Sequence, residues 1–276
     1  MPDVAMPDAE AFETGFGRYS AQRFENGASI AGEESLVEET PVALNYNEHP
    51  HAVMLATPTD LEDFAVGFSI TEGIVETSAE IEALDVIPSR HGVAIMMRIP
   101  ERRAARLDSM RRSLPGMGGC GLCGIEKLDA ALRLPPPVGT KLRVTAQALG
   151  RACRSMPDLQ ALGRHTGASH AAVLAAADGN IETAREDAAR HNAMDKLVGH
   201  LARAGIPASS GFVLVSSRAS YELVQKAASA GFELMAAISA PTGLAVRIAH
   251  TTGMTLVGFA RDGRFTCYAN KQRLIS

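Results

Sequence analysis

Two cysteines three positions apart lie in a glycine-rich segment, Pro115–Gly124. Glycine allows backbone conformations and close approaches that other residues exclude, so we expect an accessible loop that presents the sulfur atoms of Cys120 and Cys123. Apolar residues recur at helical spacing over Ile125–Leu132, which places the two thiols at or just before the start of a helix. The positive end of a helix favours the thiolate, which attacks electrophilic sulfur or binds a metal.

Three interpretations fit this Cys-x-x-Cys pair: a persulfide-forming or redox-active pair, half of a zinc site, or two small residues that pack at a tight turn. The flanking glycines argue against the third. A deaminase-type zinc site needs His-x-Glu or Cys-x-Glu with Pro-Cys-x-x-Cys, and the chain has neither, because Gly119 precedes Cys120. His165 and His170 lie too far along the chain from Cys120 and Cys123 for a zinc finger. A zinc site is therefore the second of the three interpretations, after the persulfide-forming or redox-active pair.

The other two cysteines, Cys153 and Cys267, are isolated in stretches that read as helix and strand, and we interpret them as ordinary core or surface thiols. The chain has 276 residues, is 46% hydrophobic, carries a net charge of -4 and lacks tryptophan. This composition supports one large or two small domains and argues against a disulfide framework and against nucleic-acid binding. There is no signal-like N-terminus and no long apolar run, so we predict a cytoplasmic protein that does not enter the membrane.

The chain is expected to begin with a flexible, polar leader over residues 1–32, followed by an α+β subdomain over 33–114. In this subdomain we predict two hairpins and a helix capped by Asp60. A basic helix, Arg102–Arg112, closes it, and its arginines form either a solvated face or a surface for an anionic ligand or acidic partner. The hairpins are expected to pair residues 38–46 with 51–57 and residues 81–87 with 93–99.

Residues 115–138 hold the cysteine loop, its helix and a proline-rich connector, and residues 139–276 are expected to form an α/β domain. Strands are predicted around Asp178-Gly179, a helix ends at Gly205, and strands and helices then alternate to a final hairpin around Asp262-Gly263. Three polar residues near the start of the helix before Gly205 are candidates for holding an anion, although capping would also explain the asparagine. These residues are His191, Asn192 and Lys196. His170, at a strand start, is interpreted as a structural histidine.

Several segments together resemble the FdhD family, the formate dehydrogenase accessory sulfurtransferases, over nearly the whole chain after the leader. No single segment is as specific as their joint order. They are Cys120-Gly-Leu-Cys123-Gly, Asp60-Leu-Glu-Asp-Phe-Ala-Val-Gly-Phe, Thr71-Glu-Gly-Ile, Glu186-Asp-Ala-Ala-Arg-His-Asn-Ala-Met-Asp-Lys196, Ser239-Ala-Pro-Thr and Gly258-Phe-Ala-Arg.

The resemblance implies a cytidine deaminase-like α/β domain and a homodimer. It also implies a sulfurtransferase that accepts persulfide sulfur from a cysteine desulfurase. The sulfur would pass to the molybdenum or tungsten bis(molybdopterin guanine dinucleotide) cofactor before formate dehydrogenase receives it. Cys120 corresponds to the persulfide carrier, and Cys123 to the second cysteine, whose role is less settled. The family's cofactor-binding segment corresponds to Phe259, Ala260, Arg261, Asp262, Gly263 and Arg264.

From the residues alone, Arg261 and Arg264 could bind phosphate beside a tight turn, or belong to an ordinary Asp-Gly hairpin with solvated arginines. Two alternative functions use the same cysteines. One is a thiol-disulfide oxidoreductase in which Cys120 and Cys123 cycle as a disulfide, and the other is a cofactor-binding chaperone whose cysteines hold zinc.

Overall fold

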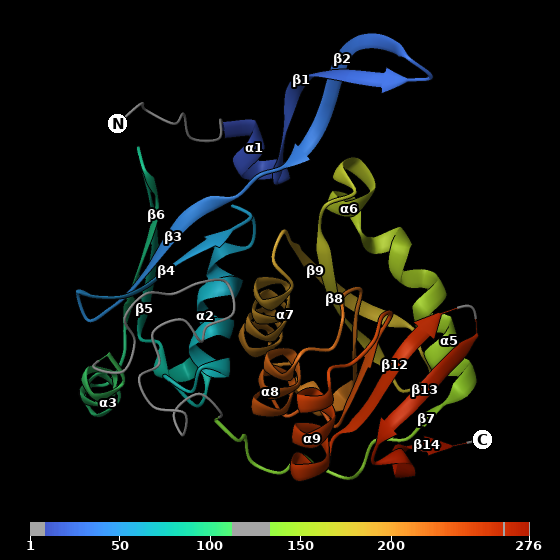
Figure 1. Cartoon of the computed structure of the whole chain (residues 1–276). Helices are drawn as coiled ribbons and strands as arrows, with labels where there is room; N and C mark the ends of the chain where they lie inside the picture. The colour runs from blue at the N-terminus through green and yellow to red at the C-terminus, as the bar shows by residue number, and fades with distance from the viewer. Residues whose placement is uncertain (1–8, 112–132, 262, 276) are drawn as a thin grey trace.

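Two β-sheets lie on opposite sides of a pair of helices, α2 and α7, in this computed structural model, which describes residues 9–111, 133–261 and 263–275 (Figure 1). Each sheet packs its apolar face toward one of the two helices. The predicted division of the chain near residues 115–138 falls between the two sheets in sequence, but the helices join them into one packed body in space.

The N-terminal sheet has four strands in the order β4-β3-β6-β5, with β3 parallel to β6 and both hairpins antiparallel. Alternate side chains of β3 and β6 are buried against α2, as expected for a sheet with one covered face. The structure confirms both predicted hairpins and both predicted helices of this region. The elements are β3 (Thr40–Tyr46), β4 (His49–Ala56), α2 (Leu61–Thr71), β5 (Ala83–Ser89), β6 (Gly92–Arg98) and α3 (Glu101–Arg111).

Asp60 does begin α2, but its side chain accepts no capping hydrogen bond, so the predicted cap is wrong. Its backbone is left-handed, with φ 52°, and its Oδ1 lies 3.5 Å from Nε of Arg185 instead. The carbonyl of Asp60 still accepts the first helical hydrogen bond, from the N–H of Phe64 at 2.9 Å. An aspartate tolerates this conformation better than most residues do.

The N-terminal region differs from the expected flexible leader. After α1 (Ala9–Thr14), β1 (Phe16–Glu25) and β2 (Ala28–Val37) pair over their full length and project from the body as a two-stranded arm (Figure 1). The turn is Asn26–Gly27, with φ 50° and 83°, and Asn-Gly is a strong hairpin signal. The sequence analysis did not predict these strands because polar residues occupy both faces of the arm. The alternation of apolar and polar residues that is typical of a half-buried strand is therefore absent.

The C-terminal sheet has six strands in the order β13-β12-β11-β10-β8-β9, and β10, β11 and β12 run parallel. Helices α7, α8 and α9 cover one face and α5 packs on the other, which confirms the predicted α/β class. A short pair, β7 with β14, lies at one end. The elements are β7 (Val144–Thr145), α5 (Ala146–Ser155), α6 (Ala161–Thr166), β8 (His170–Ala176), β9 (Ile181–Asp187), α7 (Arg190–Ala204), β10 (Gly211–Val215), α8 (Tyr221–Ser229), β11 (Leu234–Ala237), α9 (Gly243–Thr252), β12 (Thr255–Arg261), β13 (Arg264–Ala269) and β14 (Leu274–Ile275).

Helices α2 and α7 approach so closely that their backbones touch at two glycines. A Cβ atom on Gly67 would lie 1.7 Å from the carbonyl oxygen of Asp195, and one on Gly199 would lie 1.8 Å from that of Asp63. Only glycine fits at such a crossing, so these two positions set the distance between the halves of the molecule. Every helix in the described part of the chain is too short or too polar to span a membrane.

Candidate functional site

The predicted sulfur-bearing residues, Cys120 and Cys123, lie outside the described residues, together with the helix predicted to follow them and Asp262. The structure does describe the residues that flank the cysteine segment on both sides. It also describes Cys153 on α5 and Cys267 on β13, both free and partly buried. Burial raises the pKa of the Cys153 thiol to about 11, so this thiol stays protonated and poorly nucleophilic at neutral pH.

Helix α3, which leads into the cysteine segment, is fixed by ion pairs to residues 76–80, which lie between α2 and β5. The buried Arg103 places its Nε 3.0 Å from Oε1 of Glu80 and its Nη2 2.9 Å from Oε1 of Glu76. Arg102 adds a contact of 2.8 Å to the same Glu80 oxygen. The hydrogen bond from Arg103, with those from the Glu76 N–H and Arg102, lowers the pKa of Glu80 to about 2. Arg103 is therefore structural, whereas the Arg102 side chain stays 73% exposed, as expected for a solvated helix face.

Arg133, the first described residue after the cysteine segment, is bound to the end of α2. Its guanidinium donates to the backbone carbonyls of Thr71, at 3.2 Å, and Glu72. It covers Gly73, which has φ 64° and where a Cβ would lie 2.5 Å from the guanidinium. A cation is favourable at the negative end of a helix. Arg133, where the chain continues after the cysteine segment, is thus bound to the Thr71-Glu-Gly-Ile motif.

The side chains of the same motif enter a buried ionic cluster between α2, α7 and α8. Lys226 Nζ lies 3.0 Å from both carboxylate oxygens of Asp195, 2.8 Å from Oε1 of Glu72 and 3.0 Å from Oγ1 of Thr71. The Thr71 hydroxyl donates to Asp195 Oδ1 at 2.7 Å. Burial alone would lower the pKa of Lys226, but Asp195 and Glu72 outweigh it and raise this pKa above its ordinary value. Lys226 is therefore a permanent buried cation.

Sequence reasoning missed this cluster. A signal was available, because Lys226 stands three residues after Leu223 on the apolar face of its helix, where a charged residue requires a buried partner. The partners could not be read from the sequence, since Asp195 lies 31 positions from Lys226 and Glu72 lies 154 positions from it.

Asn192 and Lys196, predicted as candidates for holding an anion, are turned into the protein instead. Lys196 Nζ lies 2.8 Å from Oδ2 of Asp187 and donates to the Thr57 carbonyl at 3.0 Å. Asn192 Nδ2 donates to the Leu55 carbonyl at 2.7 Å and to Asp187 Oδ1 at 3.1 Å. Lys196 and Asp187 have no exposed side-chain surface. These contacts join the end of β4 to the start of α7, so Asn192 and Lys196 stabilise the fold at this point. The prediction that these two residues bind an anion is wrong.

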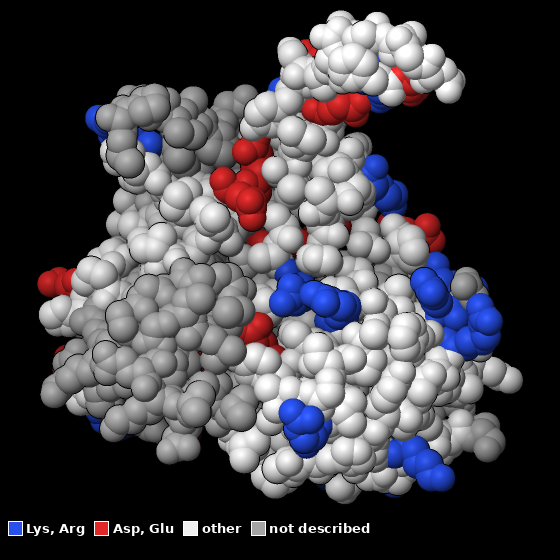
Figure 2. Space-filling model, viewed as in Figure 1, with Lys and Arg blue, Asp and Glu red and all other residues white. Residues whose placement is uncertain are grey.

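His191 and His170 lie near the carboxyl end of the parallel strands, where ligands of open α/β sheets usually bind. His191 Nε2 lies 2.5 Å from Oε2 of Glu222 at the start of α8. Burial, with the charge of Arg190, lowers the pKa of His170, so that this ring stays neutral at neutral pH. Figure 2 shows one group of Lys and Arg side chains beside α7 and a second group at the β12–β13 hairpin, with uncharged surface between them.

The predicted cofactor-binding segment, residues 259–264, lies at the same edge of the sheet, where β12 ends and β13 begins. Within it, Phe259 has a left-handed backbone, with φ 53°, at a bulge in the pairing of β12 with β13. Its N–H donates to the carbonyl of Ser239 at 3.0 Å, and its side chain remains 42% exposed. A bulky residue in this conformation costs about 1–3 kcal/mol and often marks a functional position. The bulge turns an aromatic ring outward beside the motif that begins at Ser239.

A hollow of about 290 Å³ lies against this segment and is lined by Phe259, Arg261, Arg264, Phe265 and Thr266. Both arginines are exposed and face each other across the hairpin, while Ala260 is buried in the core and Gly263, with φ 70°, forms the turn. Two guanidinium groups beside an aromatic ring suit a ligand with phosphates and a flat base.

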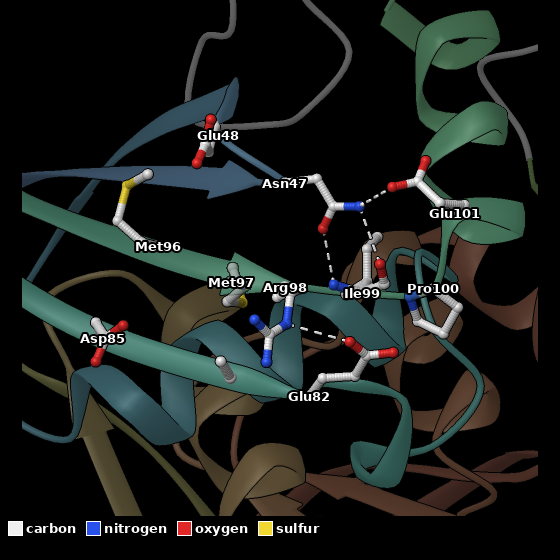
Figure 3. A pocket seen from close by; sticks show the side chains of 11 residues that line it. Asn47, Glu48, Glu82, Asp85, Met96, Met97, Arg98, Ile99, Pro100 and Glu101 are labelled. Carbon is white, nitrogen blue, oxygen red and sulfur yellow. Dashed lines mark hydrogen bonds and ion pairs between the residues drawn. The ribbon is translucent and has the colours of Figure 1, made fainter.

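A larger pocket, of about 490 Å³, lies between the β3–β4 turn, β5, β6 and the start of α3 (Figure 3). Four acidic residues and Arg98 are its charged lining residues, and Arg98 Nε already lies 3.2 Å from Oε2 of Glu82. This net negative charge would repel phosphates, so the smaller basic hollow is the better nucleotide candidate. The acidic residues are Glu48, Glu82, Asp85 and Glu101.

Comparisons with known proteins agree with the resemblance. The FdhD/NarQ family matches residues 37–275. Sulfur carrier protein FdhD of Xanthomonas euvesicatoria pv. vesicatoria is 46% identical over 271 residues, covering 98% of this chain and 96% of the relative. The protein of that name from Bordetella petrii is 49% identical over 241 residues and covers 87% of each.

A solved structure has the same fold. The crystal structure of a putative formate dehydrogenase accessory protein from Desulfotalea psychrophila superposes with a TM-score of 0.74, at 21% identity, over 94% of this chain and 99% of the other. The similarity of sequence, which extends from the arm to the last strand, and the shared fold lead to one assignment. This chain belongs to the FdhD/NarQ family.

Proposed function

We propose that this protein is a sulfur carrier, which accepts persulfide sulfur from a cysteine desulfurase on Cys120. It passes the sulfur to the molybdenum or tungsten bis(molybdopterin guanine dinucleotide) cofactor destined for formate dehydrogenase. One observation carries the proposal: the Cys120-Gly-Leu-Cys123 pair stands in a chain 46% identical to a sulfur carrier protein over 271 residues. The likeness to a formate dehydrogenase accessory protein supports the part of the proposal that makes formate dehydrogenase the client enzyme.

The chemistry requires two exchange steps that balance. The Cys120 thiolate attacks the terminal sulfur of the donor persulfide, the donor S–S bond breaks, and the donor cysteine leaves as a thiolate. Cys120 then carries the persulfide. Attack of the Cys123 thiolate on the inner sulfur releases the terminal sulfur as sulfide and leaves a Cys120–Cys123 disulfide. The two thiols supply the two electrons that reduce the transferred sulfur, and a cellular thiol reductant restores the pair.

The cofactor is the cargo of this reaction, and we propose that its guanine nucleotide binds at the hollow of the β12–β13 hairpin. Arg261 and Arg264, which line this hollow, would bind phosphate oxygens, and the exposed Phe259 ring would offer a face on which a guanine can stack. The separate group of Lys and Arg side chains beside α7 adds attraction for the phosphates.

The carrier role is tested by mass spectrometry of the protein after incubation with a cysteine desulfurase and cysteine. We expect one added sulfur atom on the Cys120 peptide, complete loss of this addition in Cys120→Ala, and its retention in Cys123→Ala, because only the first thiol needs to accept sulfur. A matched variant, Cys153→Ala, should behave as the wild type, since that thiol stays protonated. Bound zinc, or a disulfide that forms with no sulfur uptake, would contradict the proposal and favour the alternative functions.

The nucleotide site is tested with GDP as the probe, by titration calorimetry. Replacing both Arg261 and Arg264 with alanine should weaken GDP binding at least about tenfold, because two charge-assisted phosphate contacts are lost. Arg247→Ala is the control, since this exposed arginine lies on α9 and does not line the hollow. Equal binding by the double variant and the control would place the nucleotide elsewhere.

A further inference from the structure

The described residues on both sides of the cysteine segment, residues 112–132, bind to one stretch of the chain. On the upstream side, Arg103 of α3 binds two carboxylates of this stretch, at 2.9 and 3.0 Å. On the downstream side, Arg133 donates to two backbone carbonyls of the same stretch. All four groups belong to residues 71–80, which lie between the end of α2 and the start of β5. The two ends of the cysteine segment therefore share one support.

This support is fixed to the helices that lie next to it. The Thr71 hydroxyl donates to Oδ1 of Asp195 on α7 at 2.7 Å, and Nζ of Lys226 on α8 lies 3.0 Å from Oγ1 of Thr71. Farther along the stretch, the Ser78 hydroxyl donates to the Ala202 carbonyl of α7 at 3.0 Å. Functional groups are placed most precisely when the residues that hold them are themselves fixed. The stretch can therefore hold both ends of the cysteine segment in place.

Arg133 binds to carbonyls that the last turn of a helix leaves without helical partners. Its guanidinium donates to the carbonyl of Thr71 at 3.2 Å and to that of Glu72. Gly73, with φ 64°, leaves the space for it, because a Cβ at this position would lie 2.5 Å from Nη2 of Arg133. The negative end of the helix dipole also attracts the cation. The end of α2 is thus shaped and charged to receive a guanidinium.

The contact contributes little to the stability of the fold. Arg133 is exposed and lies outside the helices and strands that the structure describes. The end of α2 is closed without it, since the Gly73 N–H donates to the Ile70 carbonyl at 2.9 Å. The connector that follows is held separately, because the Val138 N–H donates to the Thr252 carbonyl at 2.9 Å. The main consequence of the contact is therefore the place at which the chain leaves the cysteine segment.

We propose that Arg133 is a positioning residue for the transfer of sulfur from a protein donor, an inference that rests on the proposed function. Cys120 stands nine positions after Arg111 (120 minus 111), and Cys123 stands ten positions before Arg133 (133 minus 123). The places at which the two ends are held therefore limit the volume that the thiols can reach. A protein donor meets Cys120 only in the orientations that the two surfaces allow, so that limit favours productive encounters. A small persulfide approaches from any side and gains much less.

The test compares a protein donor with a small donor, on the full-length protein. Mass spectrometry of the Cys120 peptide gives the initial rate of sulfur uptake, first with a cysteine desulfurase and cysteine, then with glutathione persulfide. In the second reaction the Cys120 thiolate attacks the terminal sulfur, the S–S bond breaks, and glutathione leaves as a thiolate. For Arg133→Ala we expect kcat/KM with the desulfurase to fall about tenfold, and the rate constant with glutathione persulfide to stay within about twofold of the wild type.

Two further substitutions of arginine show whether the contact itself is responsible. Arg133→Lys should recover part of the rate with the desulfurase, since an ammonium group can still donate to carbonyls at a helix end. Arg143→Ala is the matched control and should behave as the wild type. Arg143 is also exposed and also donates to carbonyls, at 2.8 and 2.7 Å, but these belong to Thr140 and Leu142 beside it.

A glycine substitution removes the contact from its other side. Gly73→Ala should displace the guanidinium and lower kcat/KM with the desulfurase as Arg133→Ala does, because the far end of a flexible side chain gives way to the new methyl group. Gly205→Ala is its control. Gly205 also ends a helix with a left-handed backbone, φ 69°, so alanine is equally strained there, but its Cβ would meet no described atom within 4 Å.

The outcomes separate this inference from the proposed function. If the wild type takes sulfur from the desulfurase and Arg133→Ala does so at the rate of Arg143→Ala, Arg133 does not position the thiols. An equal loss with both donors would also overturn the inference, since it would mean that the variant changes the thiols themselves. A wild type that takes up no sulfur from the desulfurase would contradict the proposed function, and the inference with it.

Discussion

Replacing Lys226 with methionine should lower the free energy of unfolding by about 3–5 kcal/mol, the usual cost of removing one partner from a buried ion pair. The ammonium group has four oxygen partners within 3.0 Å, and the Asp195 side chain is 2% exposed. Methionine preserves most of the volume but leaves this carboxylate buried, with the Thr71 hydroxyl as its remaining hydrogen-bond donor among the described side chains. Urea unfolding at neutral pH measures the loss.

The double variant Lys226→Met with Asp195→Asn separates the charge from the packing. Removing both charges together should recover most of the stability, because the neutral amide still accepts the Thr71 hydrogen bond. Glu72 needs no substitution, since its side chain keeps 35% of its surface exposed and can be hydrated. A single variant that costs less than about 1 kcal/mol, or a double variant no better than the single, would show that the cluster is not held by its charges.

Replacing Gly67 with alanine should destabilise the protein by about 3 kcal/mol or more, at the upper end of the range for overpacking. The added methyl group would meet the Asp195 carbonyl oxygen at 1.7 Å. Because a backbone atom cannot rotate away as a side chain can, the helices α2 and α7 would have to separate. Gly199→Ala should behave in the same way from the opposite helix, where the Cβ would lie 1.8 Å from the Asp63 carbonyl oxygen.

A glycine inside another helix provides the control. Gly150 lies in α5, and among the described residues a Cβ there would meet only the end of the flexible Arg154 side chain, at 3.3 Å. Gly150→Ala should therefore be neutral or stabilise the fold by up to about 1 kcal/mol, since alanine is the better helix former. Thermal unfolding followed by circular dichroism compares the variants. A Gly67→Ala protein as stable as Gly150→Ala would mean that the contact between the helices is not tight.

Regular patterns in the sequence predicted the central elements well. The helix ending at Gly205 and the strands around Asp178-Gly179 formed where periodicity and turn residues placed them. Such elements follow from local preference and one buried face. The arm escaped prediction because neither of its faces is buried in the chain itself, so that only the Asn26–Gly27 turn indicated it.

Residues of the candidate site were harder to predict, because their roles depend on contacts between distant segments. Lys196 and Asn192 looked suited to anions by their place at a helix start, yet they bind Asp187 and the carbonyls of Thr57 and Leu55. The partners Thr57 and Leu55 are 139 and 137 positions away from them. The left-handed backbone of Phe259 was equally hidden, since phenylalanine gives no signal for that conformation.

The contact between Gly67 and Gly199 also has a consequence for synthesis on the ribosome. The two glycines are 132 positions apart (199 minus 67), so α2 is made long before α7 can cover it. At about 5–20 residues per second, the interval is roughly 7–26 s, during which this close-packing face of α2 has no partner. The two helices can therefore pack together only after the second glycine has left the ribosome.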